Sequence, residues 1–115
     1  EFQKRTKIDV KSNVNLDSQN VDQDRATTLF RIFQETLTNI SRHAQADKIL
    51  VDLYQQDKNL ILKVEDNGIG ITESQITSPK SLGILGMRER AFVWGGTVEF
   101  IPAKHGVNVE ITIPL

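Results

Sequence analysis

Three short segments contain the residues that could carry chemistry, and the first has four polar side chains at helical spacing. Glu35, Asn39, Arg42 and His43 follow one another at steps of three or four residues, so on a helix they share one face. That face combines a carboxylate, a neutral amide oxygen and cations within about two turns, roughly 12 Å. Polar helix faces are usually only solvated, so this segment fits either a solvated face or a charged ligand.

The second segment runs from Asp66 to Gly70 and reads Asp-Asn-Gly-Ile-Gly. Asn-Gly is typical of a tight hairpin turn, but no alternating strand follows it here. A dinucleotide-binding loop needs a third glycine where Glu73 stands, and the Walker and EF-hand patterns are absent. What remains is a carboxylate at a strand end, followed by a glycine-containing backbone that a flat ligand can approach closely.

The third segment spans residues 82–90 and reads Leu-Gly-Ile-Leu-Gly-Met-Arg-Glu-Arg. Gly83 and Gly86 stand where a helical pattern begins, and exposed amides at a helix N-terminus favour anions. An ordinary flexible loop entering a helix explains the same residues equally well. None of the three segments is specific by itself, whereas their order and spacing together are.

Apolar periodicity predicts the elements that position these segments. A step of three or four residues predicts a long helix at 22–45, with one buried stripe made of Ala26, Leu29, Phe30, Phe33, Leu37, Ile40 and Ala44. A second helical pattern runs from Gly86 through Trp94 and stops at Gly95-Gly96. Alternating apolar residues predict strands at 8–16, 49–53, 60–64, 97–101 and 107–113. Residues 72–82 lack periodicity and are predicted to be a mobile excursion.

The order strand, helix, two strands, loop, helix, two strands predicts an α+β fold. We expect a two-layer α/β sandwich in which a mixed, mostly antiparallel sheet carries helices on one face. The 115 residues suit one domain, which we place at 7–115 after an N-terminal tail or expression scar at 1–6. The absence of cysteine excludes disulfides and thiol chemistry, and two histidines leave little for a histidine-based metal site.

The formal net charge of −1 gives no general reason to expect nucleic acid as a partner. No apolar run approaches the length of about 20 residues that a membrane-spanning helix needs. We therefore expect a cytoplasmic domain that makes no contact with a membrane itself, although its parent protein could be anchored in one.

In order and spacing, the three segments resemble the N box and the two glycine boxes of the ATP-binding catalytic domain of bacterial sensor histidine kinases. This family shares a Bergerat-type fold with gyrase-type, Hsp90 and mismatch-repair ATPases. The stretch Glu-x-x-x-Asn-x-x-Arg-His-Ala, together with Gly-Met-Arg-Glu-Arg, is most similar to the subfamily paired with helix-turn-helix (NarL/LuxR-type) response regulators. The likeness covers residues 7–115, with Ser81 where the second glycine box commonly has a further glycine and Gly106-Val107 where many relatives have Gly-Thr.

The resemblance implies that the chain binds ATP and Mg²⁺ and supplies the γ-phosphoryl group to a histidine on a separate, upstream dimerisation domain. It implies that Asn39 holds the metal, that Asp66 reads the adenine amino group, and that Gly83 and Gly86 hinge a lid at about 71–85. Glu35 becomes the catalytic residue, which accepts a proton from the attacking imidazole or orients it. The implied nucleotide-binding residues are Asn39, Arg42, His43, Asp66, Gly68, Ile69, Gly70, Gly83, Ile84, Gly86 and Met87.

Neither His43, inside the N box, nor His105, in a predicted hairpin turn, is a credible phosphoacceptor. We therefore expect a histidine kinase catalytic fragment that does not phosphorylate itself. Its implied partners are the dimerisation domain and a cognate response regulator. The alternative is an anti-sigma-type serine kinase or regulatory nucleotide-binding module of the same fold, which needs no upstream histidine domain. An ordinary structural α+β domain without a ligand is the third interpretation.

Overall fold

The computed structural model describes residues 8–16, 21–41, 45–70, 83–103 and 105–115. Its elements are β1 (Asp9–Asn15), α2 (Gln23–Asn39), β2 (Lys48–Gln56), β3 (Asn59–Asp66), α4 (Ile84–Phe92), β4 (Thr97–Pro102) and β5 (Val107–Pro114). This is the order that the apolar pattern predicts. The expected mobile excursion at 72–82 lies outside the described residues.

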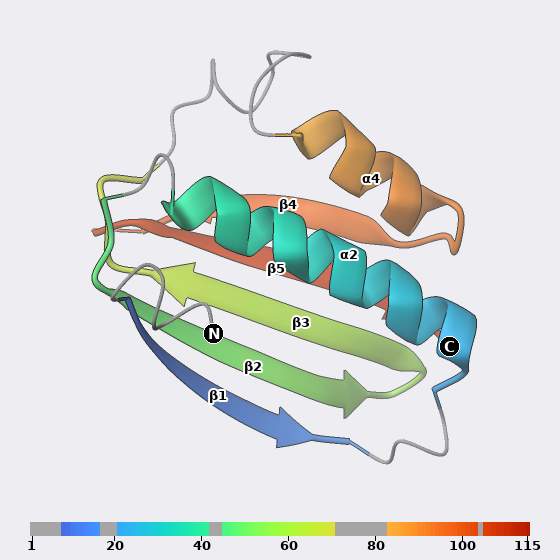
Figure 1. Ribbon diagram of the computed structural model, residues 1–115. Coiled ribbons are helices and arrows are strands. Elements are labelled where there is room, and N and C mark those ends of the chain that lie inside the picture. Colours follow the sequence, from blue (N-terminus) through green and yellow to red (C-terminus); the bar gives the residue numbers. More distant parts are fainter. Residues whose placement is uncertain (1–7, 17–20, 42–44, 71–82, 104) are drawn as a thin grey trace.

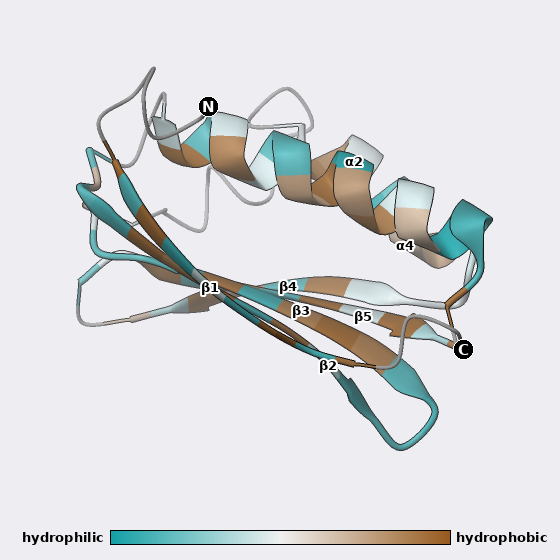
Figure 2. Cartoon of the chain, turned by 60° about the horizontal axis from the view of Figure 1, so that its bottom comes forward, coloured by the Kyte–Doolittle hydropathy of each residue, from teal (hydrophilic) through white to brown (hydrophobic). Residues whose placement is uncertain are grey.

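The five strands form one mixed sheet in the order β1-β2-β3-β5-β4. β1 pairs with β2 in parallel, and the other three pairs are antiparallel. Both helices lie on one face of the sheet, with α2 over its middle and α4 beside it (Figures 1 and 2). The two-layer α+β prediction is therefore confirmed.

Helix α2 begins where the sequence places its start, with Asp22 as its N-cap. The Asp22 side chain accepts a hydrogen bond from the Arg25 amide at 3.1 Å, which satisfies one of the free amides of the first turn. The predicted end at residue 45 is wrong, because the α-helix ends at Asn39. The Ile40 amide bonds to carbonyls both three and four residues back, and Gln45 has a left-handed φ of 52°. Residues 40 and 41 continue as π-helix, and residues 42–44 of the predicted helix, Ala44 of the predicted stripe included, lie outside the described residues.

The buried stripe of α2 overlaps the predicted one but is rotated from it. Leu29 and Ile40 are buried as predicted, and Phe33 and Leu37 are partly buried against the core. Leu29, Ile32, Thr36 and Ile40 face the core, and the Thr36 hydroxyl donates to the Ile32 carbonyl at 2.9 Å. Phe30, predicted to be buried, is 56% exposed, and Ala26 is exposed as well. Both line an apolar groove of about 590 Å³ that lies between α2 and strands β1, β2 and β3.

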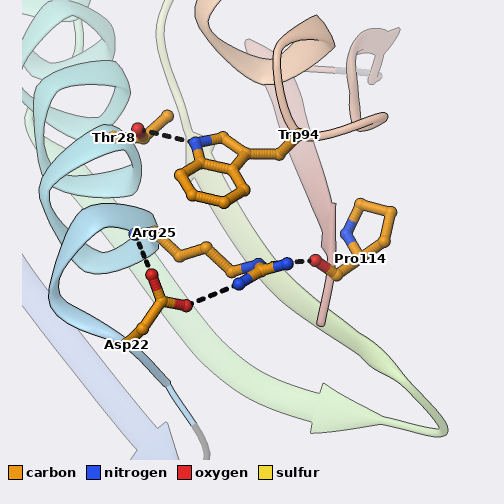
Figure 3. A network of polar contacts seen from close by, with 5 residues as sticks. All are labelled: Asp22, Arg25, Thr28, Trp94 and Pro114. Atoms are coloured by element: carbon orange, nitrogen blue, oxygen red, sulfur yellow. Dashed lines mark hydrogen bonds and ion pairs between the residues drawn. The ribbon is translucent and has the colours of Figure 1, made fainter.

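A polar network ties the start of α2 to the end of the chain (Figure 3). Arg25 pairs with Asp22 at 2.6 Å and donates to the Pro114 carbonyl at 2.9 Å, while its guanidinium lies 4.4 Å from the centre of the Trp94 ring. The Trp94 indole donates to the Thr28 hydroxyl at 2.9 Å. The hydrogen bond from Arg25 holds the pKa of Asp22 below its usual value. Trp94 is thus partly buried against the core, beside the start of α2.

Helix α4 spans Ile84–Phe92, two residues earlier at each end than the predicted Gly86–Trp94, and a turn leads from it into the predicted glycine pair. The Gly95 amide bonds to the Phe92 carbonyl and the Gly96 amide to the Ala91 carbonyl, both at 2.8 Å. Gly95 adopts a left-handed φ of 75°, which a residue without Cβ allows at low cost. The turn at these glycines reverses the chain, so that β4 runs back along the sheet and α4 packs against β4 and β5.

Candidate functional site

The three chemistry-bearing segments come to the same end of the domain. The C-terminal ends of α2 and β3 lie at the left of Figure 1, and the N-terminal end of α4 is the end of that helix nearer to them. The described contacts there form two clusters. One surrounds Asp66 at the end of β3, and the other joins α2 to the first turn of α4.

Asp66 points to the side of the sheet that the helices cover. It pairs with Ile49 of β2 and is in phase with the buried Val64 and Leu62 of its own strand. Its side chain is 2% exposed, and its Oδ1 accepts a hydrogen bond from the Gly68 amide at 2.8 Å. Its Oδ2 is buried and has no hydrogen-bond partner within the described part of the chain. The layer between sheet and helices therefore contains a carboxylate oxygen to which none of the described residues donates a hydrogen bond.

Burial raises the pKa of Asp66 above its usual value. The amides of Gly68 and Val107 act in the opposite direction, because hydrogen bonds to the ionised form lower the pKa of a carboxyl. The neighbouring Glu65 raises the pKa further through repulsion between two negative charges. A buried group with a shifted pKa and an unpaired oxygen is typical of functional sites.

Gly106 packs directly on Asp66. It has a left-handed φ of 83°, and a Cβ there would lie 2.7 Å from Asp66 Oδ1 and closer still to the Asp66 carbonyl oxygen. Gly70, also at φ 83°, has the Gly106 carbonyl oxygen 3.2 Å from the position of its own missing Cβ. The sequence offers Gly106 only as a turn glycine. The sequence alone does not show that Gly106 covers the Asp66 carboxylate, because the two residues are forty positions apart.

Asn67, inside the first glycine box, has a structural role. Its Oδ1 accepts from the amides of Asp47 and Lys48 at 3.0 Å each, and its Nδ2 donates to Asp47 Oδ1 at 2.5 Å. These bonds fix the start of β2 against the end of β3. The neighbouring carboxylate of Asp66 is thereby held at a rigid strand end.

The second cluster joins the polar face of α2 to the start of α4. A Cβ at Gly83 would lie 2.9 Å from Glu35 Cδ, so the Glu35 side chain lies against the Gly83 backbone. One turn further along each helix, Asn39 Nδ2 donates to the Met87 sulfur at 4.0 Å. Glu35 and Asn39 are both half-buried. This polar face is therefore partly covered by α4 rather than fully solvated.

The remaining predicted site residues differ in exposure. Ile69 is 70% exposed, Ile84 and Met87 are buried, and Gly68, Gly70 and Gly86 are half-buried. A Cβ at Gly86 would make only an ordinary contact, at 3.5 Å from Arg90 Nη1, so the described structure does not require glycine there. Arg42 and His43 lie outside the described residues.

The acidic and histidine side chains of the described segments form no group of three that could hold a metal ion by themselves. A metal at this end of the domain therefore needs other oxygen donors, such as the Asn39 amide and the oxygens of a ligand. Mg²⁺ fits this donor set, since it keeps several waters and is commonly shared with phosphate oxygens. In the part of the chain that the structure describes, no helix is long and apolar enough to cross a membrane.

The arrangement suits a flat, polar ligand with an anionic tail. A donor-rich ring can use the buried carboxylate of Asp66, next to a backbone that is kept close by glycines. The face with Glu35 and Asn39 lies where α2 meets the N-terminal end of α4, whose amides and dipole favour negative charge.

The chain is similar to known proteins in both sequence and fold. Residues 24–115 match the sequence profile described as histidine kinase-, DNA gyrase B-, and HSP90-like ATPase. The signal transduction histidine-protein kinase/phosphatase UhpB of Salmonella typhimurium is 36% identical over 86% of this chain and 19% of its own length. The sensor histidine kinase LiaS of Bacillus subtilis is 36% identical over all of this chain and 31% of its own length.

A solved structure has the same architecture. The histidine kinase domain of the blue-light activated histidine kinase from Erythrobacter litoralis superposes with a TM-score of 0.76. It is 27% identical and is matched over 99% of this chain and 56% of that one. The chain thus spans about a fifth to a third of the two curated relatives named above and about half of this solved domain.

Proposed function

Since this chain belongs to the histidine kinase-, DNA gyrase B- and HSP90-like ATPase family, we propose that it is the ATP-binding catalytic domain of a sensor histidine kinase. In this role it binds Mg-ATP and supplies the γ-phosphoryl group to a histidine on a separate dimerisation domain. The observation that supports this most directly is the buried Asp66 carboxylate, whose Oδ2 has no donor among the described residues.

Asp66 is proposed to read adenine. When ionised, its carboxylate is an acceptor only, and the exocyclic amino group of adenine is a donor. Guanine carries a carbonyl at that position, which would bring two acceptors together and leave both unpaired. Asp66 therefore provides both binding and selectivity against GTP.

Asn39 is proposed to hold Mg²⁺ through its amide oxygen, with Arg42 or His43 adding positive charge toward the phosphates. When bound, the ion neutralises charge on the phosphate oxygens. This chain's own residues then bind and orient the nucleotide. Gly83, at the left-handed start of α4 (φ 63°), allows the chain to bend there, and the backbone around Gly68, Ile69 and Gly70 passes beside the base.

Glu35 is proposed to act on the attacking group. It lies one turn before Asn39 on the same face, so its carboxylate can accept a proton from the incoming imidazole or orient that ring. A positioned base typically contributes 10²- to 10⁴-fold. Glu35→Gln should therefore slow phosphoryl transfer by about that factor and leave ATP binding almost unchanged.

The proposed partners are the histidine-bearing dimerisation domain and a response regulator of the NarL/LuxR type. By their names, UhpB is a signal transduction histidine-protein kinase/phosphatase and LiaS is a sensor histidine kinase, and each is several times longer than the matched segment. The proposed location of this domain is the cytoplasm, with neither nucleic acid nor membrane in contact with it.

The proposal is tested by thermal unfolding of the wild-type chain and Asp66→Asn with MgATP, MgGTP or magnesium tripolyphosphate. At 100 times its Kd, a ligand specific for the native state adds about 2.7 kcal/mol to the free energy of unfolding. We expect this gain for wild type with MgATP, and much smaller gains with the other two ligands and with the variant. Equal stabilisation by MgATP and MgGTP would show that Asp66 does not read adenine. No stabilisation by MgATP would overturn the nucleotide-binding role.

A further inference from the structure

The contact between Asn39 and Met87 joins two helices at the proposed metal-binding amide. Asn39 Nδ2 lies 4.0 Å from Met87 Sδ, although the two residues are 48 positions apart. Met87 is fully buried, at 0% exposure, on the first turns of α4. Packing therefore holds its sulfur in place, and a side chain that bonds to this sulfur is held in place as well.

The chemistry of the pair determines the orientation of the amide. A thioether sulfur accepts a hydrogen bond but cannot donate one, whereas an asparagine amide has a donor end and an acceptor end. The NH₂ end of Asn39 must therefore face Met87. Because the two ends lie on opposite sides of the same planar group, the carbonyl oxygen of Asn39 is directed away from Met87.

We propose that Met87 is a positioning residue for Asn39, whose sulfur selects the amide orientation in which the oxygen faces the metal of a bound nucleotide. The inference rests on the proposed function, because it requires Asn39 to be a metal ligand. Leucine at position 87 would fill nearly the same volume but offers no acceptor, so the hydrogen bond that favours this amide orientation would be lost. Beside its packing in the core, Met87 then affects metal-dependent binding through Asn39.

The first test compares ADP affinity with Mg²⁺ and with EDTA in wild type and Met87→Leu. A weak neutral hydrogen bond corresponds to a severalfold change in affinity. We expect Met87→Leu to weaken Mg-ADP binding about three- to fivefold and to leave metal-free ADP binding unchanged. Ile32→Leu, a volume-conserving change at a fully buried position of α2 outside the proposed site, is the matched control and should change neither affinity.

The outcomes separate the two proposals. If wild type binds ADP no better with Mg²⁺ than with EDTA, the metal-binding role of Asn39 fails. If wild type shows the Mg²⁺ effect but Met87→Leu equals wild type, or loses both affinities equally, Met87 has no positioning role and the proposed function stands. In an Asn39→Ala background, Met87→Leu should cause no further loss, and a full additional loss would also overturn the inference.

A second measurement needs no change at position 87. Met87 is the only methionine of the chain, so selective methyl labelling gives one methionine NMR signal from this site. Adding Mg²⁺ to the ADP-saturated wild type should shift this signal, and the shift should disappear in Asn39→Ala. An unchanged signal in wild type, or the same shift in Asn39→Ala, would contradict the coupling.

Discussion

Gly106 lies on top of Asp66, so close that a Cβ would collide with both the backbone carbonyl and the side chain of the aspartate. Each atom that it would meet is fixed. The carbonyl belongs to the end of β3, and Oδ1 is held by the Gly68 amide. Position 106, in the loop between β4 and β5, therefore requires glycine, because Asp66 occupies the space that a side chain would take.

Gly106→Ala should therefore destabilise the chain by more than its backbone conformation requires. A left-handed φ costs a non-glycine residue about 1–2 kcal/mol, and the collision with backbone adds to that. Gly95→Ala is the matched control, since Gly95 has a similar φ of 75° and its nearest contact, with Pro114, is an ordinary one at 4.0 Å. Urea unfolding should show Gly106→Ala at least about 1 kcal/mol less stable than Gly95→Ala. Equal losses would mean that the loop can move away from Asp66.

Asp66→Asn should stabilise the ligand-free chain. Burial opposes the charged form of this residue, and one of its oxygens has no donor in the described structure. Leaving a buried polar group unpaired costs about 1–3 kcal/mol, and more when the group is charged. We expect the free energy of unfolding at pH 7 to rise by about 1 kcal/mol in the variant, measured with urea in the absence of nucleotide. A less stable variant would show that the carboxylate contributes to the fold.

The stability of the ligand-free chain should depend on pH through the same group. Because the pKa of Asp66 is raised in the folded state, that state binds its proton more tightly than the unfolded chain. The stabilisation that proton binding by Asp66 gives to the folded state is fully present below the unfolded pKa, near 4. It is lost as the pH rises through the higher pKa of the folded state. The difference in unfolding free energy between Asp66→Asn and wild type should therefore be smallest below pH 4 and grow upward from there. A difference that shrinks with rising pH would contradict the sign of the shift.

Two apolar residues of α2, Ile32 and Phe30, differ in burial, so their replacement by alanine should lower the free energy of unfolding by different amounts. Ile32 is fully buried against the sheet, whereas Phe30 is more than half exposed at the rim of the apolar groove. Ile32→Ala should cost about 2–4 kcal/mol, and Phe30→Ala less than about 1 kcal/mol. Urea unfolding of both variants, followed by fluorescence of the single Trp94, measures the difference. Similar losses would restore the predicted stripe in which Phe30 is buried.

These two residues also show how far the sequence could predict the fold. The step of three or four residues identified α2 and its length within one or two turns. However, a stripe through Phe30 and Phe33 fits that step as well as one through Ile32 and Thr36. Thr36 is polar, and it is buried only because its hydroxyl bonds to its own helix. Periodicity measures apolarity along one element, so it cannot decide between two neighbouring faces.

The candidate site has the same limit. Local pattern located Asp66 at a strand end and Asn39 on a polar helix face, because both statements concern neighbours in sequence. The closing contact of Gly106 and the sulfur contact of Met87 join segments about forty or more residues apart. They depend on the strand order and on where α4 crosses the sheet, which a single sequence does not fix.

The last prediction concerns Gly83, which combines a left-handed backbone with a movable neighbour. Its φ is 63°, and the atoms that a Cβ would meet belong to the end of the Glu35 side chain. That side chain can rotate away, unlike the carbonyl at Gly106. Gly83→Ala should therefore cost about as much stability as Gly95→Ala, about 1–2 kcal/mol, from backbone strain alone.

The effect of Gly83→Ala on activity should be larger than its effect on stability. The new methyl group displaces the Glu35 carboxylate from the start of α4, so in a kinase that includes the phosphoacceptor domain the transfer rate should fall as it does in Glu35→Gln. Gly95→Ala, with the same strain far from Glu35, should keep normal transfer. In a Glu35→Gln background, Gly83→Ala should cause little further loss, because the displaced group is already inactive. A fully additive loss would show that Gly83 acts independently of Glu35.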